Sequence, residues 1–248
     1  MSLGHLKQGS LSEVLPLTLF PYEYMNLYPG TSLKFNPKIH LKPEAFFRNL
    51  VVKKTPKLLV AFKEDGPTGF LNIGIVGEVV LENDNFIVYG KQRARITRIN
   101  PAGKTGARIA ECLLLEDSPE LSSLADEDKP IILGGIEAIR RWLKKLEPLV
   151  EEEEEEMKKE IRYRIDQIES RRRDCELAYS LPWHMLLDLD SYVPKETKVK
   201  FLNTDGVVDR LQGIIDFIKL EITVRNCAEA LAGEPDAPKE IIESIEGK

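Results

Sequence analysis

Three histidines and three cysteines are the residues of this chain best suited to metal binding or redox chemistry. The histidines are His5, His40 and His184, and the cysteines are Cys112, Cys175 and Cys227. No histidine has a second metal-ligating residue at helical or strand spacing, and no two cysteines form a CxxC pair. The sequence therefore predicts no metal site and no disulfide framework. We interpret His184, beside Trp183, as a packing or surface residue.

Gly103-Lys104-Thr105 resembles the end of a phosphate-binding loop. That motif requires another glycine five positions before Gly103, where this chain has Arg98. The segment also joins two predicted strands instead of opening a helix, so no helix dipole would support its amides. We interpret it as a hairpin turn and predict no nucleotide cofactor.

A nucleophile is equally hard to find. The chain has no GxSxG motif, and Cys112 falls at a predicted core position of a strand, where we expect a buried and inert thiol. Any serine and lysine could still meet in space as a dyad, although no local feature selects a pair. The sequence therefore predicts no catalytic residue, and an unrecognised hydrolase site stays open as an alternative.

Two charged segments are candidate binding features. Residues 151–156 are six consecutive glutamates, which we interpret as a solvated helix face, with a bound cation or basic partner as the alternative. Lys91, Arg93 and Arg95 alternate along a predicted strand, so they should share one face and form a basic patch with Arg98. This patch could contact RNA phosphates. We favour pairing with carboxylates of the acidic half, because no aromatic residues interleave with the patch.

The two halves of the 248-residue chain differ in charge. Residues 1–117 hold 15 Lys and Arg against 11 Asp and Glu, a net +4, whereas residues 118–248 hold 20 against 30, a net −10, which together give −6. This asymmetry predicts two subdomains. The expected boundaries are a flexible start at 1–12, a β-rich subdomain at 13–117, a helical subdomain at 118–230 and a tail at 231–248.

Composition is that of a soluble globular protein, with 42% hydrophobic and 31% charged residues. No run of eighteen apolar residues occurs, and the first residues show no secretory signal. Together with the unpaired cysteines, these features favour a cytoplasmic location without membrane contact.

The first half has the pattern of a β domain. Pro16, in an apolar start, favours a sheet edge, and Asn83-Asp84 predicts a tight turn between two strands. One short helix is expected at 45–54. Strands are expected at 14–17, 32–35, 58–62, 73–81, 86–99 and 107–115. Successive strands on short connections favour an antiparallel meander or a small barrel.

The second half has the pattern of long helices. Apolar residues at steps of three and four predict a helix over 132–150, which Pro148 should kink or end. Further helices are expected at 157–180, 182–190 and 194–203, followed by a long last helix that Asp205 caps. The predicted fold class is therefore α+β, with a β domain followed by a helical bundle.

Several short segments resemble a known family in order and spacing. They are Leu15-Pro16-Leu17, Tyr28-Pro29-Gly30, Leu58-Leu59-Val60-Ala61, the strand at 73–79, Tyr89-Gly90-Lys91-Gln92-Arg93-Ala94-Arg95-Ile96, Leu177-Ala178, the helix at 194–202 and Val207-Val208-Asp209-Arg210-Leu211. Over residues 13–225 this order is similar to the amino-terminal substrate-recognition domain of Lon-type ATP-dependent proteases.

The resemblance implies a small, PUA-like β-barrel followed by a helical bundle, without the ATPase and Ser-Lys peptidase domains of the full enzyme. It implies unfolded or tagged client proteins as partners, support of oligomer assembly, and a role in proteolysis and protein quality control. Tyr22, Tyr24, Tyr28 and Phe35 are candidate client contacts where they are exposed, although for Phe35 we favour the core. The alternatives are a fragment of an ATP-dependent serine protease, a free-standing adaptor, and a PUA-like RNA-binding module, against which the net charge of −6 argues.

Overall fold

The computed structural model describes residues 14–36, 41–52, 56–65, 68–101, 108–115, 128–151, 154–190 and 192–232. The contacts divide the chain into two compact units, Met1–Asp117 and Ser118–Lys248, which we call the β unit and the helical unit. The segment Gly103-Lys104-Thr105, the predicted flexible start and most of the predicted tail lie outside the described residues.

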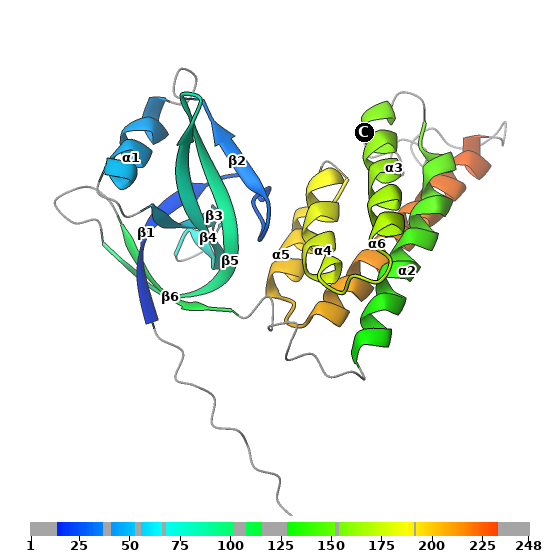
Figure 1. Ribbon diagram of the computed structural model, residues 1–248. Helices are drawn as coiled ribbons and strands as arrows, with labels where there is room; N and C mark the ends of the chain where they lie inside the picture. The colour runs from blue at the N-terminus through cyan, green and yellow to red at the C-terminus, as the bar shows by residue number, and fades with distance from the viewer. Residues whose placement is uncertain are drawn as a thin grey trace, which may run out of the picture. The chain divides into compact units, whose positions relative to one another are not determined.

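In its described residues, the β unit contains one mixed sheet and one helix (Figure 1). Its elements are β1 (Val14–Tyr22), β2 (Ser32–Phe35), α1 (Leu41–Val52), β3 (Lys57–Lys63), β4 (Phe70–Glu82), β5 (Asn85–Asn100) and β6 (Ile109–Leu114). The strand order is β2-β5-β4-β3-β1-β6, and a further pairing of β5 with β6 closes five of the strands into a ring. The structure thus has the small barrel that the strand pattern favoured.

The barrel is not purely antiparallel, which corrects the prediction. β1 and β3 pair in parallel, with Thr18 opposite Leu58 and Tyr22 opposite Phe62. Parallel neighbours require a crossover that returns the chain to the same end of the sheet. The connection between β1 and β3, which includes β2 and α1, is long enough to do this.

Pro16 lies where β1 has a neighbour on one side only. Val14 to Thr18 pair with β6, and the strand then changes partner so that Thr18 to Tyr22 pair with β3. The Leu19 N–H donates to the Arg108 carbonyl on the β6 side at 2.9 Å, so by alternation the Pro16 nitrogen faces away from β6. The missing N–H therefore removes no ladder hydrogen bond, and the edge prediction is right for this half of the strand.

The strands pack into two clusters on opposite faces of the sheet. One cluster is aliphatic and consists of Leu19, Leu59, Ala61, Val76, Ala94, Ala110 and Cys112. The other is aromatic, because Phe47 of α1 packs with ring-centroid distances of 4.9 Å to Phe20 and Phe35 and 5.6 Å to Phe86. Cys112 is buried as predicted, and burial raises the pKa of its thiol to about 11.

The predicted tight turn at Asn83-Asp84 is confirmed. Both residues have positive φ angles, 47° and 62°, between β4 and β5. Two successive left-handed residues form the hairpin turn whose twist matches that of the flanking strands, and Asn and Asp tolerate this conformation better than other side chains.

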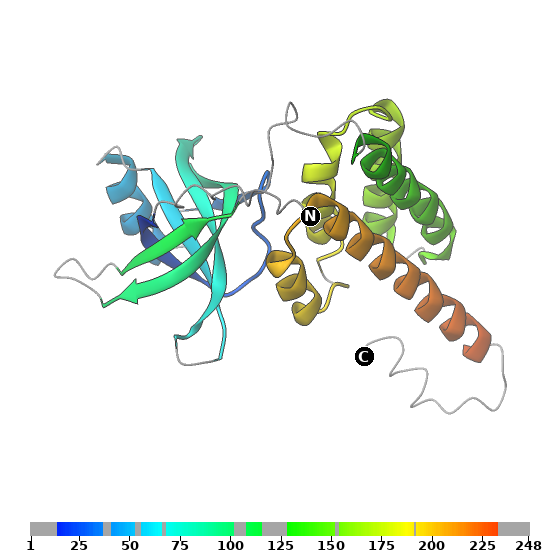
Figure 2. The ribbon, with the colours of Figure 1, turned by 90° about the horizontal axis from the view of Figure 1, so that it is seen from below.

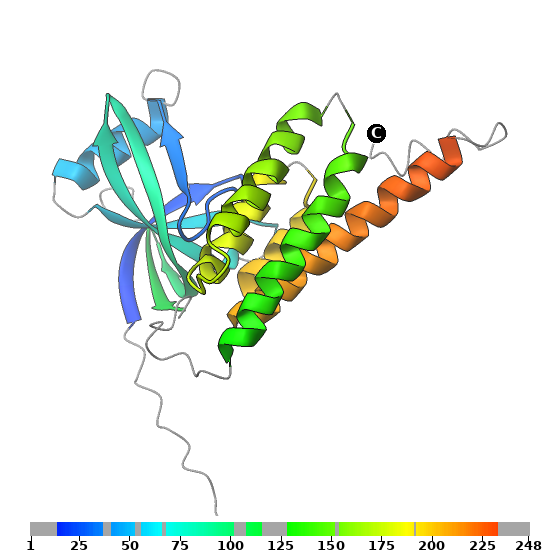
Figure 3. The same ribbon diagram turned by 45° about the vertical axis from the view of Figure 1, so that its right-hand side comes forward.

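The helical unit consists of five helices and one short 3-10 turn in the part of the chain that the structure describes. They are α2 (Asp128–Leu146), η2 (Glu147–Leu149), α3 (Glu155–Ser170), α4 (Leu177–Asp188), α5 (Lys195–Asn203) and α6 (Val207–Ala232). α2 and α6 lie side by side (Figures 2 and 3). They run parallel, since Gly135 faces Leu211 and Trp142 lies beside Lys219. Among the described residues, no helix has both the length and the apolar run that crossing a membrane requires.

The predicted helix boundaries differ most from the structure where α3 ends and α4 begins. α2 ends before Pro148, and a 3-10 turn follows, as the proline predicted. α3, however, ends at Ser170 instead of continuing to about residue 180. The Asp174 carboxylate accepts hydrogen bonds from Arg171 Nε and from the Glu176 backbone N–H, both at 2.8 Å. These local bonds stabilise a turn instead of a further helical turn, and Pro182 then lies inside α4 instead of starting it.

Arg225 of α6 connects several elements of the helical unit. Its guanidinium donates to Glu154 at 2.6 and 3.1 Å and to Glu221 at 2.9 Å, and it also approaches the Leu149 carbonyl at 3.4 Å. Glu154 also shares a hydrogen bond with Tyr192, and burial together with this bond raises the pKa of Tyr192 to about 12. Glu151, Glu155 and Glu156 are exposed as predicted, whereas Glu154 is not part of a solvated face.

We expect an Arg225→Gln variant to be less sensitive to acid than the wild-type chain. The hydrogen bond from Arg225 lowers the pKa of Glu154, so the carboxylate stabilises the fold above its ordinary pKa, and this contribution is lost as the pH falls through the lowered value. Between about pH 7 and about pH 3, the wild-type chain should lose about 1 kcal/mol more unfolding free energy than the variant. Urea unfolding followed by tryptophan fluorescence would measure both losses, and equal losses would contradict this prediction.

Candidate functional site

An aromatic patch on the β unit consists of Tyr22, Tyr24 and Phe46. It rests on the buried Phe20, whose ring centroid lies 6.1 Å from that of Tyr22 and 5.5 Å from that of Phe46. Tyr24 is 65% exposed and meets Tyr22 edge-on at 5.8 Å. Tyr22 and Phe46 are half-buried. The patch therefore presents an exposed ring on a support that the core holds in place.

A charged pair adjoins the patch residues in sequence through Glu23. Glu23, between the two tyrosines, accepts a hydrogen bond from Lys63 Nζ at 2.6 Å, and both side chains are more than half exposed. This bond lowers the pKa of the Glu23 carboxyl.

Tyr28 and Phe35 do not belong to the surface. Tyr28 is completely buried, and its hydroxyl donates to the Met25 carbonyl. Its backbone N–H donates to the Thr31 hydroxyl at 2.8 Å, which forms part of a tight turn. Tyr28 therefore fails the exposure condition for a client contact, while Phe35 lies in the aromatic cluster as we expected.

The predicted basic patch is interrupted by two bulges in β5. Gly77 pairs with Gly90 and Val76 with Gln92, so Lys91 is an additional residue that reverses the alternation of side chains. Arg93 is completely buried, which corrects the prediction that it shares an exposed face with Lys91 and Arg95. From Arg93 to Arg95 the pairing with β4 is regular, so these two side chains still lie on one face of the sheet and differ in burial. A second register shift follows between Ile96 and Arg98.

The other three cations of the predicted patch, Lys91, Arg95 and Arg98, are exposed. Lys91 forms an ion pair with Glu78 of the neighbouring strand at 3.2 Å and lies 5.7 Å from the Tyr89 ring. The four residues therefore do not form the continuous basic surface that simple alternation predicted.

His184 lies beside a buried ion pair between α3 and α4. Arg164 donates to Asp188 through Nε and, at 3.0 Å, through Nη2, and both charged side chains are less than a tenth exposed. Burial and the neighbouring Arg164 lower the pKa of His184, with Asp188 opposing them. The histidine is half-buried at this pair, which fits the packing role that we expected. Within the described ranges, no three His, Cys, Asp or Glu side chains form a possible metal site.

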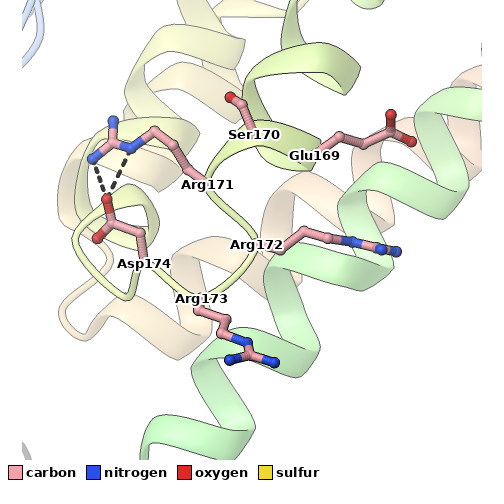
Figure 4. A pocket seen from close by; sticks show the side chains of 6 residues that line it. All are labelled: Glu169, Ser170, Arg171, Arg172, Arg173 and Asp174. Atoms are coloured by element: carbon pink, nitrogen blue, oxygen red, sulfur yellow. Dashed lines mark hydrogen bonds and ion pairs between the residues drawn. The ribbon is translucent and has the colours of Figure 1, made fainter.

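A cationic turn between α3 and α4 is the feature that the sequence prediction missed. A surface hollow there is lined by Glu169, Ser170, Arg171, Arg172, Arg173 and Asp174 (Figure 4). The available signal was the run of three arginines, which we placed within one long helix. Because α3 ends at Ser170, these arginines instead lie on a turn.

Comparison with known proteins identifies a related fold. No protein-family model matches the sequence, and no curated protein matches it. The N-terminal domain of Mycobacterium avium complex Lon protease is similar in structure, with a TM-score of 0.55 and 18% identity over 83% of this chain and 98% of that one. A Lon N-terminal domain protein from Xanthomonas campestris gives a TM-score of 0.46 and 16% identity over 82% of this chain and 98% of that one. At 18% identity the first likeness concerns the fold, and this chain has the fold of a Lon N-terminal domain.

Proposed function

We propose that this chain is a non-catalytic protein-binding domain whose aromatic patch captures exposed apolar segments of unfolded or tagged client proteins. The observation that carries the proposal is the geometry of Tyr22 and Tyr24, one ring fixed by the core and the next 65% exposed. Tyrosine buries a large area at a low cost in side-chain entropy, and it is enriched among the residues that dominate binding energy.

The proposed role is weak capture rather than tight binding. One small patch supplies modest affinity, and several copies held together in an oligomer would raise the effective affinity without new contacts. In this proposal the domain serves ATP-dependent proteolysis and protein quality control in the cytoplasm. ATP hydrolysis and peptide cleavage are then the work of other domains or chains.

RNA binding has less support than protein binding. Of the four basic residues predicted on β5, Arg93 is buried and Lys91 is paired with Glu78. Electrostatic binding to RNA depends on several cations that reach phosphates together. The aromatic patch, by contrast, needs no rearrangement to contact an apolar segment.

We expect Tyr24→Ala to weaken binding of an unfolded apolar segment by roughly 5- to 30-fold, or about 1–2 kcal/mol. Because Tyr24 is mostly exposed, the substitution should leave the stability of the β unit nearly unchanged. Fluorescence anisotropy with a labelled, uncharged peptide rich in Phe and Leu would measure the affinity.

Tyr163 provides a matched control, since it is 56% exposed and lies in the helical unit. Tyr163→Ala should leave the affinity for this peptide unchanged. The proposal fails if the wild-type chain does not bind the peptide at high concentration. It also fails if both tyrosine substitutions weaken binding equally.

A further inference from the structure

The turn between α3 and α4 concentrates positive charge in a unit whose sequence is strongly acidic. Residues 118–248 carry 20 Lys and Arg against 30 Asp and Glu. We define the arginine turn as the charged residues that line the hollow, together with the charged residues of α2 that contact them. Its cations are Arg140, Lys144, Arg171, Arg172 and Arg173, and its carboxylates are Glu137, Glu169 and Asp174. Five cations against three carboxylates leave a local excess of positive charge.

The three carboxylates are already occupied. Arg140 donates to Glu137 at 2.9 and 2.5 Å, and both Arg140, at 2.9 Å, and Lys144, at 2.6 Å, donate to Glu169. These bonds lower the pKa of Glu137 and of Glu169, so both stay ionised and paired at neutral pH. Asp174 is likewise held by Arg171, as the dashed lines in Figure 4 show.

Arg172 and Arg173 are the cations of the arginine turn that these hydrogen bonds do not involve. Arg172 is 60% exposed and, among the described residues, its ion pair is with Glu137 at 3.8 Å, a carboxylate that Arg140 already binds through two nitrogens. Arg173 is exposed and has no ion pair within the described part of the chain. Figure 4 shows both side chains extending away from the pair of Arg171 and Asp174.

Stabilisation of the α3 end explains only part of this arrangement. Cations near a helix C-terminus interact favourably with its dipole, and Arg171, fixed by Asp174, already satisfies that requirement. Two further arginines directed to solvent add little to helix stability, because exposed charges are screened by water and salt. Their two exposed guanidinium groups can therefore bind further carboxylates in the paired geometry that arginine favours.

The shape of the site favours an extended partner over a small molecule. The hollow is open to solvent, whereas small-molecule sites bury most of their ligand. We infer that the arginine turn binds acidic segments of protein partners, meaning runs of Asp and Glu in an unfolded or flexible chain. The inference rests on the proposed function, because it gives the same protein-binding domain a second class of client segment to recognise.

Two labelled peptides test this inference on the full 248-residue chain. One contains six consecutive glutamates, and the other has six glutamines in their place. The glutamate peptide should bind, the glutamine peptide should not, and the affinity should fall as salt rises. Arg172→Glu combined with Arg173→Glu should weaken binding of the glutamate peptide at least about tenfold. Arg172→Gln with Arg173→Gln, a milder change, should weaken it in the same direction.

Arg95→Glu combined with Arg98→Glu is the matched control, since it reverses two exposed arginines in the β unit. It should leave binding of the glutamate peptide unchanged. The inference is overturned if both pairs of substitutions weaken binding equally, or if neither does. It is also overturned if the turn binds tripolyphosphate but not the peptide, or if the wild-type chain self-associates through the turn at the peptide-binding concentration. The uncharged apolar peptide reports separately on the aromatic patch, so failure of one proposal is distinguishable from failure of the other.

Discussion

Replacing Arg164 by methionine is expected to lower the free energy of unfolding of the helical unit by about 3 kcal/mol. Arg164 and Asp188 join α3 to α4, and their side chains are 8% and 9% exposed. Arg164 also donates to Gln167 at 2.9 Å. Removal of the guanidinium leaves the Asp188 carboxylate buried without its cation. The free energy lost in this way is larger than the free energy that the intact pair contributes to folding.

A double-mutant cycle separates these two effects. Arg164→Met with Asp188→Leu replaces both charges by apolar groups, so the combined variant should be more stable than Arg164→Met alone. Trp183, buried in α4, reports unfolding of this region by fluorescence. A loss below about 1 kcal/mol in Arg164→Met would show that water reaches the pair and that the unit tolerates an unpaired Asp188.

Gly90→Ala is expected to destabilise the β unit by about 3 kcal/mol. A Cβ atom at this position would lie 2.2 Å from the Tyr28 carbonyl oxygen. The backbone there cannot withdraw easily, because Gly30 N–H donates to the Gly90 carbonyl at 2.9 Å and Gly90 N–H donates to the Thr31 carbonyl at 2.8 Å. The substitution therefore forces the turn after β1 away from β5.

Gly134→Ala is the matched control, because a Cβ atom there meets nothing within 4 Å apart from its chain neighbours and the backbone of its own helix. Gly134 lies inside α2, where alanine should stabilise the helix by up to about 1 kcal/mol. Trp142 and Trp183 both belong to the helical unit, so tryptophan fluorescence does not report on the β unit. The effect of Gly90→Ala is therefore measured by hydrogen exchange of the β5 amides. Unchanged protection of these amides would count against the close packing described for Gly90.

The elements of the fold were largely predictable because their signals are local. The apolar steps of three and four over α2 place Ile132, Ile136 and Leu143 on one buried stripe. Asn83-Asp84 specified a hairpin turn through the backbone conformations that these residues tolerate. The end of α3 was not identified from periodicity, although the apolar stripe stops at Ile168, because a charged segment also fits an exposed stretch of helix. The turn depends on the bonds of Asp174.

The candidate sites depended on information that a linear pattern does not contain. Tyr22, Tyr24 and Tyr28 are the same residue type within one short segment. Tyr28 is nevertheless buried, in a turn whose backbone is hydrogen-bonded to Gly90. Lys91, Arg93 and Arg95 alternate in sequence, but the bulge at Lys91 removes Lys91 from the alternation that Arg93 and Arg95 share, and Arg93 is buried. One additional residue in a strand is enough to do this, because side chains alternate with a period of two.

The sequence by itself determined that an α+β chain would form, with a basic β half, an acidic helical half and a buried Cys112. These properties follow from composition and local periodicity, which each segment carries alone. Only the tertiary structure decided which aromatic rings reach the surface and which arginines keep a free guanidinium. Exposure and ion pairing depend on neighbours that are distant in sequence, such as Phe46 of α1, which joins Tyr22 and Tyr24 in the aromatic patch, and Glu137 of α2 beside Arg172.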